Sequence, residues 1–149
     1  IISFNYSAKK LKRCKDTLKA AVVCGMGLML IGVLCFEILP SQMLNVFSKD
    51  SEVISIGTVG FKIIGISFIP MVTSLIFPVF FQAVGSSVVS SLLTIVRTVI
   101  LFVPLGFIFS RLGLDYFWLT FPFTEVITTI VGSVMYNRFV KKNSILIKM

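Results

Sequence analysis

Two residues of opposite charge, Arg97 and Glu125, lie in stretches that are otherwise almost entirely apolar. If these stretches cross a membrane, each charge costs at least about 2.5–3.5 kcal/mol and is expected to face a neighbouring helix or a cavity. One interpretation is a static ion pair that fixes the packing of two helices. The other is that Glu125 takes up a proton or contacts a cationic solute, with Arg97 modulating it. The residue pattern leaves both interpretations open.

Polar neighbours of the two charges extend the candidate site. Thr124 and Thr128 lie on the same stretch as Glu125 and begin a polar face, and Gln82 ends an earlier apolar stretch. In membrane proteins such side chains often mediate helix packing, and a polar face toward lipid is unexpected. The candidates for coupling-ion or cavity residues are therefore Glu125, Arg97, Thr124, Thr128 and Gln82.

Residue types that support catalysis or metal binding are scarce. The chain has no histidine, and its three cysteines, Cys14, Cys24 and Cys35, have no Cys-x-x-Cys spacing. No cluster of nucleophile, base or metal ligands is apparent in the apolar stretches. We therefore expect no enzyme, no metal and no cofactor.

The composition predicts an integral membrane protein. Of the 149 residues, 56% are hydrophobic and only 13% are charged, whereas soluble domains average about 45–50% and about 25%. The net charge of +8 is better explained by loops at a membrane surface than by nucleic acid. The expected partner is the lipid bilayer, and no nucleic-acid partner is expected.

The apolar stretches predict four transmembrane helices in an all-α antiparallel bundle. The uncharged stretch between Lys62 and Arg97 is too long for one crossing, which takes about 20 residues. It therefore breaks at QAVGSS (82–87), and short connections make successive helices antiparallel neighbours. A polar loop is expected at 40–52, with Asp50 able to cap the next helix. The predicted spans are about 17–39, 53–82, 88–109 and 116–137.

The positive charges predict the orientation. A basic segment at 6–16 and a basic tail at 138–149 lie on one side of the membrane, whereas the opposite loops contain only Lys49 and Arg111 as positive residues. Because positive residues are enriched on the cytoplasmic side, both ends of this multi-pass chain are predicted to be cytoplasmic.

The prolines and the phenylalanines in the spans each allow two structural interpretations. A proline inside a span opens the helix locally, which is either a tolerated bend or a hinge that shapes a solute cavity; the residues are Pro70, Pro78, Pro104 and Pro122. The phenylalanines are predicted to face lipid, with an apolar cavity as the alternative; they are Phe61, Phe68, Phe77, Phe80 and Phe81.

Five motifs in order resemble the C-terminal part of the multidrug and toxic compound extrusion (MATE) transporters. They are FNYSAKKLKR (4–13), DSEVISIG (50–57), FFQAVGSS (80–87), IVRTVILFVPL (95–105) and GLDYFWLTFPFTE (113–125). The resemblance covers essentially the whole chain and implies the end of helix eight through helix twelve of a twelve-helix transporter. The chain would then be part of the second six-helix lobe. The start at Ile1 rather than Met likewise predicts a piece of a longer chain.

The resemblance implies secondary active multidrug efflux across the plasma membrane. Organic cations or amphipathic drugs would be exported in exchange for H⁺ or Na⁺, and an N-terminal lobe of the same chain would be the partner of these helices. In the family, acidic residues linked to ion coupling lie in helices one, seven and ten. The stretch that matches helix ten, 53–82, has Lys62 but no interior acid.

Two alternatives stay open. A lipid-linked oligosaccharide flippase of the same superfamily would be expected to have more cationic cavity residues, for which Arg97 and Lys62 are candidates. A small four-span membrane scaffold protein would need no preceding lobe.

Overall fold

The structure is a computed structural model that describes residues 1–146, and the side chains of residues 1–143. The described residues form helices and no strands. By length and composition, four helical segments can cross a membrane: Leu11–Ile38, Ser51–Ala83, Ser87–Leu112 and Leu114–Asn143. This confirms the predicted all-α membrane fold. The segments extend past most of the predicted span limits, and residues 147–149 of the predicted basic tail lie outside the described part.

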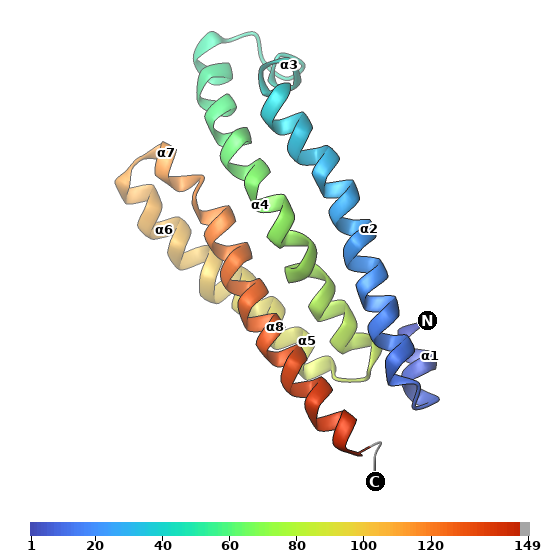
Figure 1. The fold of residues 1–149 in the computed structure, drawn as a ribbon. Helices are drawn as coiled ribbons and strands as arrows, with labels where there is room; N and C mark the ends of the chain where they lie inside the picture. Colours follow the sequence, from blue (N-terminus) through green and yellow to red (C-terminus); the bar gives the residue numbers. More distant parts are fainter. Residues whose placement is uncertain (147–149) are drawn as a thin grey trace.

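The elements follow one another with short connections (Figure 1). They are α1 (Ile2–Ser7), α2 (Leu11–Ile38), α3 (Pro40–Leu44), α4 (Ser51–Ala83), α5 (Ser87–Ile95), the π-helical segment η1 (Val96–Phe102), α6 (Val103–Leu112), α7 (Leu114–Phe117) and α8 (Thr120–Leu146). Since α5, η1 and α6 follow without a break, they form one continuous helical span.

Helix α4 is the centre of the bundle. It packs against α2 on one side and against α8 on the other, and it also contacts α5. The α5–η1–α6 span lies beside α8. Helix α1, the α4–α5 turn and the end of α8 lie at one end of the bundle, and α3 and α7 lie at the other (Figure 1). Which membrane face each end meets stays a prediction from the positive charges.

Local sequence signals explain where α4 begins and ends. The Asp50 carboxylate accepts a hydrogen bond of 2.8 Å from the backbone N–H of Glu52, which satisfies one of the free donors at a helix start. Gly85 ends the segment with a φ of 78°, a left-handed conformation that glycine adopts without a steric penalty. The turn predicted at 82–87 is therefore present.

Two local features differ from the sequence prediction. The loop predicted at 40–52 is wrong at its start, because Pro40–Leu44 forms the short helix α3 with the proline in its first turn, a favourable position for a residue without an N–H. The predicted third span contains a π-helical segment, Val96–Phe102. This segment ends two residues before Pro104, which has no N–H to donate to the carbonyl of Ile100.

An aromatic core joins α4 to α8 near the end that holds α1. Phe80 packs edge-on against Tyr136 and Phe139, with ring centroids 5.1 and 5.7 Å apart, and Phe81 packs on Phe139 at 5.7 Å. Phe77, Phe80 and Phe81 are all buried, so the prediction that they face lipid is wrong, and they line neither pocket described below. Phe61 and Phe68 are half-buried and pack on Phe36 of α2, at 4.5 and 4.9 Å.

Candidate functional site

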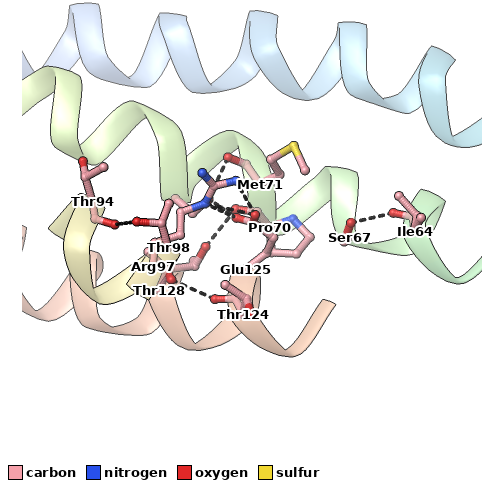
Figure 2. A network of polar contacts seen from close by, with 12 residues as sticks. Ile64, Ser67, Pro70, Met71, Thr94, Arg97, Thr98, Thr124, Glu125 and Thr128 are labelled. Carbon is pink, nitrogen blue, oxygen red and sulfur yellow. Dashed lines mark hydrogen bonds and ion pairs between the residues drawn. The ribbon is translucent and has the colours of Figure 1, made fainter. Parts of the chain in front are cut away.

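Arg97 and Glu125 form an ion pair between η1 and α8. The Arg97 Nη2 atom lies 2.5 Å from Oε1 of Glu125, and Nε lies 3.0 Å from Oε1 and 3.2 Å from Oε2. Figure 2 shows the guanidinium group lying against the carboxylate, beside the Pro70–Met71 turn of α4. The contact that the sequence suggested is therefore present, and it uses two donors of the arginine fork, a strong arrangement.

Ser74 of α4 adds a third partner to the pair. Its hydroxyl donates to Oε2 of Glu125 and also lies 3.0 Å from the Met71 carbonyl. Ser74 is fully buried, and the Glu125 side chain is only 4% exposed, whereas the Arg97 side chain is 23% exposed. Three elements, α4, η1 and α8, thus meet at one carboxylate. Sequence reasoning did not single out Ser74, although its position four residues before Pro78 was a usable signal.

Three donors contact both oxygens of the Glu125 carboxylate, because the single N–H of Arg97 Nε is shared between Oε1 and Oε2. A carboxylate offers about four lone-pair positions. Oε1 accepts from Nε and Nη2 of Arg97, and Oε2 accepts from Nε of Arg97 and from Ser74. A metal cation that binds both oxygens of this carboxylate would therefore have to displace some of these donors.

The predicted polar face of α8 turns inward. Thr120, Thr124 and Thr128 are each at most 1% exposed. The Thr128 hydroxyl donates to the Thr124 carbonyl at 2.8 Å, but among the described residues the hydroxyls of Thr120 and Thr124 have no partner. Threonines in membrane helices usually bond the carbonyl one turn earlier, as Thr94 and Thr98 do here. The two unpartnered hydroxyls are therefore unusual.

A second polar contact ties α4 to α8 one turn away from the ion pair. The Thr129 hydroxyl donates to the carbonyl of Pro70 at 2.8 Å and lies 2.9 Å from the Thr73 hydroxyl. Pro70 lacks an N–H, but its carbonyl still accepts this hydrogen bond. This contact helps to hold the helices at the level where Glu125 lies.

Two pockets adjoin the ion pair, and Arg97 lines both. The first, here the Phe121 pocket, has a volume of about 250 Å³ and is also lined by Glu125, Thr124 and Phe102. The second, the Gln82 pocket, has a volume of about 290 Å³ and is lined by polar residues and by the Leu75–Val79 side of α4. Its polar residues are Ser74, Gln82, Ser90, Thr94 and Arg97.

The remaining candidates fall at several places. Pro70 and Pro78 lie inside α4, and Pro78 lines the Gln82 pocket. Pro104 lies in the first turn of α6, and Pro122 lies in the first turn of α8, so Pro122 starts a helix rather than interrupting one. Thr128 lines neither pocket. Within residues 1–146, no group of three or more metal-ligating side chains occurs.

The fold and the site define the class of protein. A bundle of helices able to cross a membrane, with a buried ion pair between two pockets, is typical of a membrane transporter, because intramembrane charges mark solute and ion pathways. The MatE family model matches residues 1–108. The chain belongs to this family, the multidrug and toxic compound extrusion family, whose members are transporters and not enzymes. No curated protein and no solved structure matches the chain.

The family match covers only part of the site. It covers α1 to the middle of α6 and so includes Ser74 and Arg97, but Glu125 lies beyond the matched residues. The role of the carboxylate therefore depends on its geometry rather than on the match.

Proposed function

We propose that the chain is part of a secondary active transporter that exports organic cations or amphipathic drugs across the plasma membrane in exchange for a cation. In this proposal the four spans form part of the second lobe, and a first lobe of the same chain completes the solute pathway. The family membership supports transport as such. The buried carboxylate of Glu125, held by Arg97 and Ser74, is the observation that supports ion coupling.

Protonation of Glu125 is the coupling event in this proposal. A proton would neutralise the carboxylate and remove the charge that holds the Arg97 guanidinium at 2.5 Å. The positive charge would then lie in an apolar bundle without its partner, which favours a conformation in which Arg97 turns further toward solvent. The uptake of one proton would thus change the packing of α4, η1 and α8.

The coordination of Glu125 favours H⁺ over Na⁺ as the coupling ion. A proton needs one oxygen lone pair, whereas hard metal cations take several oxygen ligands at once. The carboxylate already accepts hydrogen bonds at both oxygens. The Ser74 hydroxyl contacts this carboxylate, and no second carboxylate lines either pocket.

Transport by the full-length chain in proteoliposomes tests this proposal. A fluorescent organic cation is loaded, and its movement is measured under a pH gradient and under a matched Na⁺ gradient. We expect the pH gradient to drive transport in the wild type, and Glu125→Gln to abolish the effect of the gradient. Glu37→Gln, which replaces an acid of α2 that lines neither pocket, is the control and is expected to keep it. Gradient-driven transport by Glu125→Gln would overturn the role of this carboxylate.

A flippase for lipid-linked oligosaccharides is the second candidate. It is favoured by one observation, namely that Arg97 is partly exposed and lines two pockets, so that it can meet a phosphate group. The same proteoliposomes, with a fluorescent polyprenyl-phosphate sugar in place of the organic cation, distinguish the two. Movement of the lipid between leaflets without transport of the organic cation would favour the flippase.

A further inference from the structure

The free hydrogen-bonding capacity at the ion pair belongs to the arginine and not to the acid. The carboxylate of Glu125 accepts bonds at both oxygens from Arg97 and Ser74. A guanidinium group has more N–H groups than these contacts use. Among the described residues, Nη1 of Arg97 makes no hydrogen bond, and Nη2 makes one. The pair therefore presents more free donors than free acceptors to its surroundings.

The Gln82 pocket collects further donors around this arginine. The amide of Gln82 and the hydroxyl of Ser90 make no hydrogen bond among the described residues, although both line the pocket with Arg97. They come from the two sides of the α4–α5 turn, from the end of α4 and the start of α5. Glu125 does not line this pocket, and neither does any other acidic side chain. A cation in this pocket would meet Arg97 and no compensating charge.

The remaining wall of the Gln82 pocket is apolar. Leu75, Pro78 and Val79 of α4 line it beside Ser74 and Gln82 of the same helix. Its volume of about 290 Å³ is slightly below the range of about 300–1,000 Å³ for drug-sized ligands. It therefore suits one charged group together with a small ring or a short chain.

We propose that the Gln82 pocket binds an oxyanion, a carboxylate, sulfonate or phosphate group of an amphipathic molecule, through the free N–H groups of Arg97. The planar guanidinium fork matches such groups with paired hydrogen bonds, and Gln82 and Ser90 complete the donor set. The apolar wall holds the rest of the molecule. The oxyanion belongs either to a soluble amphiphile or to the phosphate of a membrane lipid.

This inference concerns the ion pair that the proposed function uses, but it does not need transport to be tested. An oxyanion on the free N–H groups of Arg97 shares the positive charge of the guanidinium group with Glu125. Glu125 faces Arg97 from η1 and Ser74 from α4, and no other charged side chain lines either pocket. Removal of the carboxylate charge by Glu125→Gln should therefore strengthen oxyanion binding.

The test is equilibrium binding to the full-length chain in a phosphate-free detergent. The probes are 2-naphthalenesulfonate and the neutral 2-naphthalenesulfonamide, which share one ring system. We expect the sulfonate to bind at least about ten-fold more tightly than the sulfonamide, because a charge-assisted bond is stronger than a neutral one. We expect this preference to be larger in Glu125→Gln than in the wild type, since the variant lacks the carboxylate that shares the charge of Arg97. Equal binding of the two probes would overturn the proposal.

Variants assign the binding to this pocket. The double change Gln82→Leu with Ser90→Ala and the charge-neutral double change Arg97→Gln with Glu125→Gln should each weaken sulfonate binding by about ten-fold or more. Thr98→Val is the matched control, because Thr98 is on the same span and makes the same kind of backbone bond as Thr94 but lines only the Phe121 pocket. Unchanged binding in the two double variants, with a folded protein by size-exclusion chromatography, would also overturn the proposal.

Added lipid identifies the source of the oxyanion. If a lipid phosphate occupies the pocket, an anionic phospholipid in the micelle should weaken sulfonate binding by at least about ten-fold through competition. If the natural ligand is a soluble amphiphile, the same lipid should leave the affinity unchanged. A chain that transports organic cations but does not distinguish the two probes contradicts only this inference. A chain that prefers the sulfonate but transports nothing contradicts only the proposed function.

Discussion

Two clusters join α4 to α8, and they hold the helices together by different means. The aromatic core uses Phe80, Phe81, Tyr136 and Phe139, with ring centroids 5.1–5.7 Å apart. The polar cluster uses Ser74 and Glu125 with Arg97 from η1. In the core, many small contacts add up, so that each ring contributes by its volume. In the polar cluster, every group depends on its partners, because an unpaired buried charge is costly.

The difference indicates that the aromatic core keeps α4 and α8 packed, whereas the polar cluster can change its arrangement. The interactions in the aromatic core do not change with ion binding, so this end of the bundle can stay packed while the other part moves. A single proton or a bound oxyanion changes the polar cluster. A transporter needs both properties, a rigid contact and an element with two arrangements.

The largest expected effect is the loss of one member of the ion pair. Arg97→Met leaves the carboxylate of Glu125, which is 4% exposed, without its cation, and should lower the free energy of unfolding by about 3–5 kcal/mol. Glu125→Gln should cost less, since the Arg97 side chain is 23% exposed and can turn to water. Chemical denaturation in micelles measures both.

The double variant decides whether the two residues act as a pair. Arg97→Met with Glu125→Gln leaves no unpaired charge and should be more stable than the sum of the single losses predicts. Strictly additive losses would contradict an energetic coupling between η1 and α8 at this site.

Truncation in the aromatic core should cost nearly as much but without dependence on pH. Phe80 is 1% exposed, and Phe80→Ala should lower the free energy of unfolding by about 3 kcal/mol. The loss should be the same at mildly acidic and at neutral pH. Phe47→Ala, at a phenylalanine that is 85% exposed, is the control and should change stability little. A pH-dependent loss in Phe80→Ala would show that the two clusters are not independent.

Removal of the serine hydroxyl should have an intermediate effect. Ser74→Ala takes one charge-assisted bond from Glu125 and should cost about 1.5–3 kcal/mol. Ser110→Ala removes an exposed hydroxyl that bonds the Phe107 carbonyl at 2.8 Å, and it should cost much less. Equal losses in the two variants would mean that Ser74 contributes only a backbone contact.

The smallest effect is expected at the unpartnered hydroxyl of the polar face. Thr124→Val removes a buried hydroxyl without a partner among the described residues and should be neutral or stabilising by up to about 1 kcal/mol. Thr128→Val removes a bond of 2.8 Å and should cost about 1 kcal/mol. If Thr124→Val is the more damaging of the two, its hydroxyl contacts a water or a solute in the whole protein.

The sequence alone predicted the features that depend on neighbouring residues and on the amount of apolar surface. Length and hydropathy indicated four helical spans, Gly85 marked the turn, and Asp50 marked the start of α4. These are local effects of glycine conformation, capping and burial in lipid. The Arg97–Glu125 contact was also predictable, because two opposite charges on neighbouring antiparallel spans need partners.

The tertiary structure alone decided which side of each helix faces inward. Helix α4 is apolar on nearly all sides, so its sequence pattern does not mark a buried face. For this reason the sequence did not place Phe80 and Phe81 in a core or Ser74 on the carboxylate of Glu125. The packing of α4 between α2 and α8 determines which of its side chains are buried. An apolar side chain is equally stable against lipid and against protein, so only the positions of the neighbouring helices decide which side faces inward.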